Sequence, residues 1–195
     1  MTVSRPDPDK LRYNFFTKNK WCAPRTYHWE EGRCHYTFMR GYHPAHSGWR
    51  VLSTLERLWD GVPAKINLDA YRKYVGGPDV IWDHLTDLTP VAQVYGDCTW
   101  ENIVIGDSVV LIDPGYPRGF MCQENDLGKL LQSERGWELV KAGLEPKTFP
   151  GVWPRKSVVA SYVTHLHRLV RHVHPVQCIT WAKKEIEDAT NYLLS

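Results

Sequence analysis

The chain has 195 residues, of which 43% are hydrophobic and 24% are charged, and its formal net charge at pH 7 is +2. This length and composition exclude an intrinsically disordered chain and predict one sizeable hydrophobic core in place of two full domains. No long run of basic residues occurs, so charge neither requires nor excludes nucleic-acid binding, and we do not expect a nucleic-acid partner.

The cysteines point to a reducing compartment. They are odd in number and widely spaced, with no Cys-x-x-Cys pair and no zinc-binding pattern: Cys22, Cys34, Cys98, Cys122 and Cys178. Free thiols are the expected state. The N-terminal sequence MTVSRPDPDK has no apolar stretch typical of a signal peptide, and no run approaches the length of a membrane span. We therefore expect a cytoplasmic protein that does not bind a membrane.

The N-terminal residues predict a small strand region. The stretch Pro6-Asp7-Pro8 suggests a loose arm. Between residues 26 and 39, aromatic and apolar side chains recur at strand-like spacing on both sides of Glu31-Gly32. This pattern predicts two short strands joined by a tight turn.

Three helices are expected next. The first follows Ser47 as a possible N-cap, has its apolar side chains at helical spacing and ends near Asp60-Gly61. Its apolar side chains are Val51, Leu52, Leu55, Leu58 and Trp59. The second begins after Asn67 and ends at Gly76-Gly77-Pro78, and the third is predicted over residues 79–88.

A hairpin is predicted after the helices. Two apolar runs, Ile103–Ile105 and Val109–Ile112, flank Gly106-Asp107, a composition typical of a tight turn with glycine first. Since a hairpin brings its outer ends together, polar residues at those ends should lie close to each other.

Three such residues form a candidate site. Asp97 and Asn102 precede the first strand, and Asp113 follows the second. Two carboxylates and one amide oxygen form a hard oxygen site of the kind that suits Mg²⁺.

The C-terminal part is predicted to be helical. Apolar residues continue at helical spacing after Ser133 as far as Gly143, and a proline-containing loop is expected over residues 144–156. Two long apolar stripes, within residues 158–173 and 176–193, predict an antiparallel helical pair.

The order of these motifs resembles a known family. Tyr95-Gly96-Asp97, then Asn102, a hairpin and Ile112–Gly115 look like the catalytic segment of the aminoglycoside phosphotransferase and choline kinase superfamily, which has the protein-kinase fold. The segment 126–133, DLGKLLQS, resembles a stretch of the capsule-biosynthesis phosphotransferases in that superfamily. The strong resemblance covers roughly a fifth of the chain.

The resemblance implies a role for each residue. Asp97 would be the catalytic aspartate that accepts or orients the proton of the attacking hydroxyl. Asn102 and Asp113 would hold the Mg²⁺ ions that bridge the phosphates of ATP. Asp126 would be the buried carboxylate that braces the catalytic loop by accepting its backbone N–H groups. Tyr95 stands in that loop where the family usually has histidine.

The fold implied by the resemblance is α+β and protein-kinase-like. We expect a reduced N-terminal strand portion with its linker over residues 1–43 and a predominantly helical C-lobe with the catalytic hairpin over residues 44–195. Within the first portion, the segment 40–43 (RGYH) resembles the part that follows the interlobe linker in the superfamily.

The implied function is Mg²⁺-dependent transfer of the γ-phosphoryl group of ATP to a hydroxyl of a small molecule, a sugar or an amino alcohol. The sequence lacks the glycine-rich loop and the strand lysine of kinases, although Lys18 or Lys20 could be recruited for the lysine's role. One alternative is a catalytically weak, kinase-derived binding protein that acts on a protein partner or sequesters a nucleotide. Another is that a protein partner or second subunit completes the N-lobe.

Several other residues have both a functional and a structural interpretation. Trp153 and Phe149 could line an acceptor pocket or pack a loop onto the core. Cys98 beside Asp97 could be a nucleophile, but no base is placed for it. Four basic residues could contact an anionic acceptor or form a solvated helix face, namely Arg155, Lys156, Arg168 and Arg171. Four histidines lack the spacing of a helical zinc pair and are expected to be solvated or capping, namely His165, His167, His172 and His174.

Overall fold

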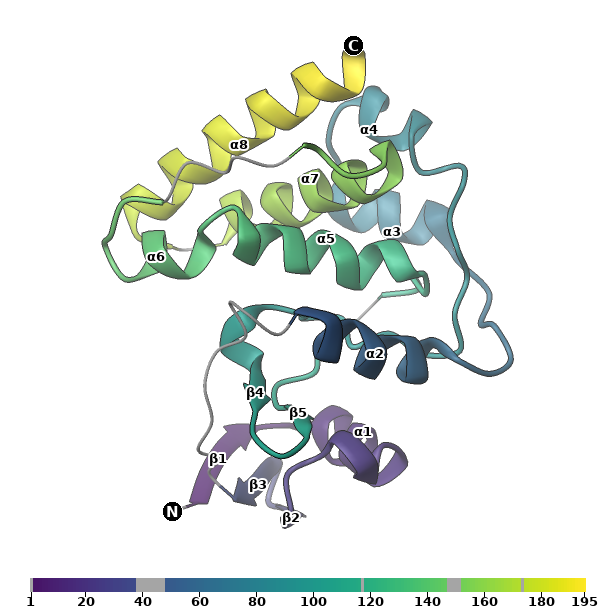
Figure 1. The fold of residues 1–195 in the computed structure, drawn as a ribbon, viewed down its shortest axis with the longest axis vertical. Coiled ribbons are helices and arrows are strands. Elements are labelled where there is room, and N and C mark those ends of the chain that lie inside the picture. Colours follow the sequence, from purple (N-terminus) through teal and green to yellow (C-terminus); the bar gives the residue numbers. More distant parts are fainter. Residues whose placement is uncertain (1, 38–47, 117, 147–151, 173) are drawn as a thin grey trace.

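The computed structural model describes residues 2–37, 48–116, 118–146, 152–172 and 174–195 (Figure 1). These residues form eight α-helices, two short 3-10 helices and two small antiparallel sheets, so the fold is α+β and mostly helical, as predicted. Four predicted features lie outside the described residues: the segment 40–43, the boundary after residue 43, the Ser47 cap and the position of Phe149.

The N-terminal region is a three-stranded sheet with one helix. Its elements in chain order are β1 (Thr2–Pro6), α1 (Leu11–Lys18), η1 (Lys20–Cys22), β2 (Tyr27–Glu30) and β3 (Arg33–Thr37). The sheet has the order β1-β3-β2, and both pairings are antiparallel. The β2–β3 hairpin and its turn at Glu31-Gly32 confirm the sequence prediction. The predicted loose arm is wrong, because residues 2–6 pair with β3 as an edge strand, a position that tolerates Pro6.

Three helices follow: α2 (Gly48–Trp59), α3 (Leu68–Val75) and α4 (Asp79–Asp83). Asn67 caps α3, since its side chain accepts a hydrogen bond from the Ala70 N–H at 3.1 Å. The first two predicted helices are confirmed, although Leu52 is exposed. The third is shorter than predicted, because the chain turns at His84, whose ring bonds the Leu193 carbonyl at 2.9 Å.

The predicted hairpin is present between the helices. It follows η2 (Trp100–Asn102) and consists of β4 (Ile103–Ile105) and β5 (Val109–Leu111). Ile105 pairs with Val109, so the connection includes Ser108 as well as Gly106-Asp107. The hairpin prediction is confirmed with one more residue in the turn.

The C-terminal half contains α5 (Gln123–Glu134), α6 (Trp137–Lys141), α7 (Lys156–Arg171) and α8 (Val176–Leu194). The helix pair α7–α8 confirms the prediction from the two apolar stripes (Figure 1). Helix α5 lies against α7 at Gly128, where a Cβ would stand 2.7 Å from Ser161 Oγ and 2.8 Å from Tyr162 N. This close approach brings the side chains of α5 beside those of α7.

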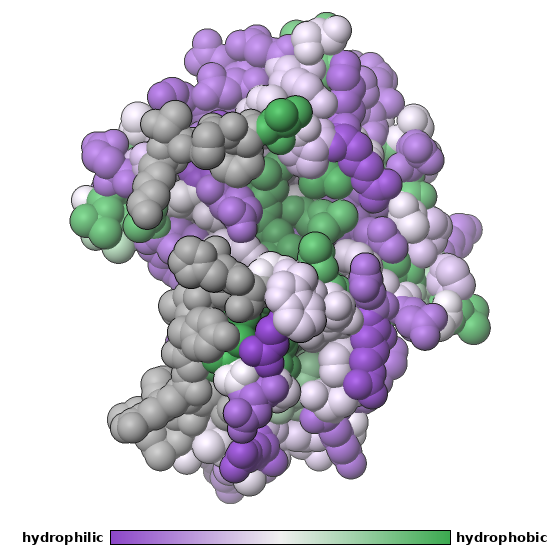
Figure 2. All heavy atoms as spheres, in the orientation of Figure 1, coloured by the Kyte–Doolittle hydropathy of each residue, from purple (hydrophilic) through white to green (hydrophobic). Residues whose placement is uncertain are grey.

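Two hydrophobic clusters hold the molecule together. One unites the N-terminal sheet and α1 with α2 and the β4–β5 hairpin, and the other unites α3 to α8. Leu127 on α5 packs against both clusters. Figure 2 shows a mostly hydrophilic face, with hydrophobic side chains gathered where the upper helical part meets the lower part. In the described part of the chain, no helix combines the length and hydrophobicity needed to cross a membrane.

Candidate functional site

A buried carboxylate fixes the loop that begins at Tyr95. Asp126, on the first turn of α5, accepts hydrogen bonds from the Tyr95 N–H at 2.9 Å, the Gly96 N–H at 2.7 Å and the Trp59 indole N–H at 3.0 Å. Burial raises the pKa of Asp126 to about 6, and the three hydrogen bonds oppose this shift. Asp126 thus ties the loop to both α2 and α5.

Inside the loop, Asn102 and Tyr95 set the position of Asp97. The Asn102 amide nitrogen donates to the Asp97 backbone oxygen at 3.1 Å and to its carboxylate at 2.9 Å. The Tyr95 hydroxyl donates to the Asn102 carbonyl at 2.9 Å. Burial raises the pKa of Tyr95 well above its ordinary value, so the phenol keeps its proton. These bonds hold Asp97 and Asn102 together at one end of the hairpin.

The segment after the hairpin docks on the same loop. The Gly115 N–H donates to the Tyr95 carbonyl at 2.9 Å, and the Ile112 N–H donates to the Asn102 carbonyl at 2.9 Å. A Cβ on Gly115 would stand 2.6 Å from the Gly96 oxygen, so the close approach requires glycine. The two ends of the hairpin therefore converge.

Asp113 has an uncommon backbone conformation between these two contacts. Its φ is 129°, a value that costs a non-glycine residue on the order of 1–3 kcal/mol. The bonds of Ile112 and Gly115 on either side maintain it. Strain of this kind is concentrated at functional sites.

Two arginines of the N-terminal region reach the Asp113 carboxylate. Arg12 on α1 forms an ion pair with Oδ1, and Arg5 on β1 lies 3.8 Å from Oδ2. The Arg12 and Asp113 side chains are each 22% exposed, so water screens this pair only partly. Lys18 and Lys20, which sequence reasoning considered for a phosphate contact, are exposed. That reasoning missed both arginines, because their partner comes from a segment about a hundred residues away.

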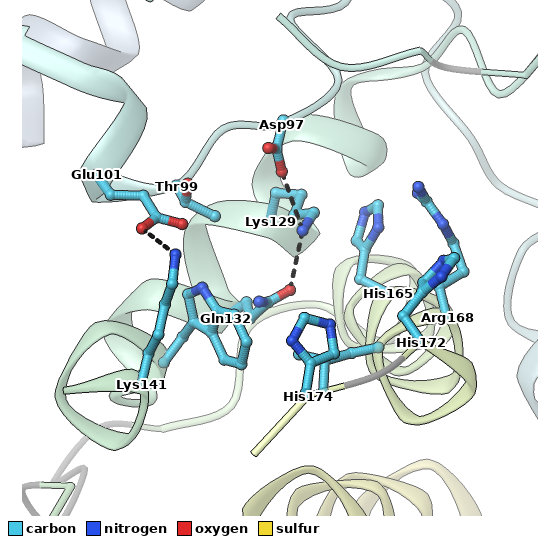
Figure 3. A pocket seen from close by; sticks show the side chains of 12 residues that line it. Asp97, Thr99, Glu101, Lys129, Gln132, Lys141, His165, Arg168, His172 and His174 are labelled. Atoms are coloured by element: carbon cyan, nitrogen blue, oxygen red, sulfur yellow. Dashed lines mark hydrogen bonds and ion pairs between the residues drawn. The ribbon is translucent and has the colours of Figure 1, made fainter. Parts of the chain in front are cut away.

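A cavity of about 240 Å³ opens beside Asp97 (Figure 3). Its lining comes from the Asp97 loop, η2, α5, α6, α7 and the residues after α7. Lys129 on α5 lies between Asp97 Oδ1, at 3.0 Å, and Gln132 Oε1, at 3.2 Å (Figure 3). Lys141 pairs with Glu101 at 2.6 Å on another side. The Asp97 carboxylate, 38% exposed, is thus accessible at a small polar pocket.

Sequence reasoning missed Lys129 as a site residue. The signal for it was present, since Lys129 stands three positions after Asp126 and a helix places such residues on one face. Its side chain is only 16% exposed.

The histidine prediction is wrong for His165, which is 2% exposed. Its Nε2 bonds the Asn125 carbonyl at 3.0 Å, and it lines the cavity together with His172 and His174. Burial lowers the pKa of His165 well below its ordinary value, and the nearby charges of Lys129 and Arg168 act in the same direction. This burial depends on the close approach of α5 to α7 at Gly128, which local sequence patterns do not encode. Helix α7 also ends at Arg171, so His172 and His174 line the cavity from the residues after the helix.

No family model, no curated protein and no solved structure matches this chain. The chemistry open to the site follows from its own side chains. Asn102 uses its amide nitrogen on Asp97, and within the described residues its amide oxygen accepts no hydrogen bond. This oxygen and the Asp113 carboxylate are hard donors that fit Mg²⁺, provided that Arg12 releases its carboxylate oxygen.

Packing decides between the alternative roles considered for Cys98 and Trp153. Cys98 is fully buried, and burial raises the pKa of its thiol well above the ordinary value, which does not suit a nucleophile. Trp153 packs against the Tyr162 and Tyr192 rings, at centroid distances of 6.4 and 5.7 Å, and so serves the core.

Proposed function

We propose that this protein transfers the γ-phosphoryl group of ATP to a hydroxyl of a small molecule in a Mg²⁺-dependent reaction. The observation that carries the proposal is Asp97, held by Asn102 at the mouth of a cavity of about 240 Å³ and adjoining the docked Asp113 segment. The proposal is supported because a carboxylate, hard oxygen donors and a cavity for a small acceptor lie in one region.

In the proposed reaction, the acceptor hydroxyl oxygen attacks the γ-phosphorus. A new P–O bond forms, the bond to the β-phosphate bridging oxygen breaks, and ADP leaves. Asp97 orients the hydroxyl and takes its proton, which then passes to solvent. Lys129, 3.0 Å from Asp97, offsets negative charge on the phosphoryl oxygens during transfer. Most of the rate enhancement would come from positioning and electrostatics.

Asn102 and Asp113 are the residues that would hold Mg²⁺. The ion would supply charge neutralisation for the phosphates of ATP. The Asp113 backbone conformation and the bonds that flank it support this role, because they hold the carboxylate in a set position.

Arg5 and Arg12 are the proposed substitutes for the missing strand lysine. In kinases a lysine on a strand, followed by a helix, contacts the phosphates. Here Arg5 lies on β1 and Arg12 on the helix that follows, and both reach Asp113. A guanidinium suits this task because its planar donors match phosphate oxygens.

The test is turnover by Asp97→Asn, measured as ADP release with a panel of hydroxyl acceptors. We expect loss of at least a hundredfold in kcat in a variant that still unfolds cooperatively, because the side chain keeps its shape but no longer accepts a proton. Asp107→Asn, on the exposed turn of the same hairpin, is the matched control and should keep full activity. Equal turnover by wild type and Asp97→Asn would refute the proposed role.

A second candidate is a kinase-derived binding protein that sequesters a nucleotide or acts on a protein partner. It is favoured by the ion pair of Arg12 with Asp113 and by the lack of a glycine-rich loop in the sequence. It predicts ATP binding without ADP release. If instead a partner or second subunit completes the N-lobe, ADP release per molecule should rise steeply with protein concentration or on adding that partner.

A further inference from the structure

The cavity beside Asp97 has an excess of positive charge. It is lined by two carboxylates and three permanently basic side chains. Each carboxylate already has a lysine partner, Asp97 with Lys129 and Glu101 with Lys141. The third basic side chain, Arg168, lies 5.3 Å from the centroid of the Tyr74 ring and near the Tyr71 hydroxyl. It has no carboxylate partner among the described residues, and its buried Nε–H makes no hydrogen bond there.

Beside Arg168, the cavity offers an unused hydrogen-bond acceptor. His165 donates from Nε2 to the Asn125 carbonyl, so its Nδ1 carries the lone pair. This Nδ1 is buried and has no hydrogen-bond partner within the described residues. Since His165 and Arg168 are three residues apart on α7, they share one wall of the cavity (Figure 3). An unpaired buried acceptor of this kind is satisfied when a hydroxyl binds against it.

The size of the cavity limits the ligand. A volume of about 240 Å³ equals about eight water molecules at roughly 30 Å³ each. It lies below the range of about 300–1,000 Å³ that is typical of drug-sized ligands. A compact, polar molecule of about monosaccharide size fits these dimensions.

We propose that the acceptor is a small polyhydroxylated anion, with its carboxylate or phosphate group on Arg168, one hydroxyl at His165 Nδ1 and another at Asp97. This inference rests on the proposed function, because it names the substrate class of the same site. It narrows the sequence-based expectation of a sugar or an amino alcohol. A cationic amino alcohol would lie against Arg168 and Lys129 and be repelled, whereas an oxyanion gives Arg168 the anionic partner that it lacks among the described residues.

The test is calorimetric titration of the nucleotide-free protein with four compounds of similar size: glucuronate, glucose 6-phosphate, glucose and glucosamine. We expect glucuronate or glucose 6-phosphate to bind at least tenfold more tightly than glucose, with glucosamine weakest. Whichever anion binds more tightly identifies the group as a carboxylate or a phosphate. Binding of glucose or glucosamine as tight as that of both anions, or no binding of any compound, overturns the proposal.

Arg168→Met is the diagnostic variant. A hydrogen-bonded charge contributes roughly tenfold to a hundredfold in affinity, so this variant should lose that factor for the anion and little for glucose. Arg171→Met is the matched control, since Arg171 is exposed on the same helix and does not line the cavity. Thermal unfolding of both variants separates a binding effect from misfolding. Anion affinity in Arg168→Met equal to that of wild type also overturns the assignment.

Failure of this inference can be told apart from failure of the proposed function. Anion binding without ADP release in the presence of Mg²⁺ and ATP keeps the ligand class and refutes phosphoryl transfer. ADP release that glucosamine stimulates and neither anion stimulates keeps phosphoryl transfer and refutes the ligand class.

Discussion

Replacing Gly115 by alanine tests the docking of the Asp113 segment on the Asp97 loop. The new Cβ would stand 2.6 Å from the Gly96 oxygen, 2.7 Å from the Gly96 carbonyl carbon and 2.9 Å from Asp97 Cβ. Two of these atoms belong to the backbone, so relief requires the two segments to separate by about 0.5 Å. Overpacking costs about 1–3 kcal/mol, and weakening of the bond from the Gly115 N–H to the Tyr95 carbonyl adds about 1 kcal/mol.

We therefore expect Gly115→Ala to lower the free energy of unfolding by about 2–4 kcal/mol, or Tm by about 6–12 °C for 3 kcal/mol. Urea denaturation and a thermal scan measure both quantities. Gly106→Ala in the turn of the same hairpin is the control, because its Cβ meets nothing within 4 Å, and its stability should change by less than about 1 kcal/mol. If the two variants unfold within about 0.5 kcal/mol of each other, the close docking of the two segments is refuted.

Three further predictions concern Asp126, Arg12 and the cysteines. Burial raises the pKa of Asp126 from 3.8 to about 6, so the folded protein retains a proton that the unfolded chain releases between those pH values. The stability contributed by this carboxyl should therefore fall as the pH rises from about 4 to about 6. Over this range, the free energy of unfolding measured in urea should fall more steeply for wild type than for Asp126→Asn. Parallel pH profiles of the two proteins would contradict the raised pKa. Arg12→Met should weaken ATP binding about tenfold, measured by titration, because the proposed contact of its guanidinium with a phosphate is lost. Lys18→Met on the same helix is the control and should leave the affinity for ATP unchanged. Equal affinities of wild type and Arg12→Met would refute the proposed phosphate contact. All five cysteines are buried, so a thiol reagent should label them at the rate of unfolding and fully in denaturant; rapid labelling of the native protein would count against this packing.

Local patterns predicted most of the elements. The hairpin at residues 103–111, the β2–β3 turn and the Asn67 cap follow from turn and capping chemistry that depends on a few adjacent residues. The convergence of Asp97, Asn102 and Asp113 followed from the geometry of a hairpin. These features were predictable because their causes are close together in the sequence.

The charged partners were not predictable in this way. The pairing of Arg12 with Asp113 joins segments about a hundred residues apart, and the pairing of Lys129 with Asp97 depends on how α5 lies against the loop. The early end of α4 has a similar cause, because His84 bonds a carbonyl near the C-terminus. Burial of His165 depends on the close approach of α5 and α7. Such contacts are set by tertiary packing, which single-sequence patterns do not encode.

The most direct test of the central claim is calorimetric titration of the full chain with ATP, with and without Mg²⁺, repeated on Asp113→Ala. The proposed function predicts Mg²⁺-dependent binding of ATP that disappears in Asp113→Ala, while the thermal unfolding of the variant still shows a folded protein. Absence of ATP binding at millimolar concentration, or equal Mg²⁺-dependent binding by wild type and Asp113→Ala, would contradict it.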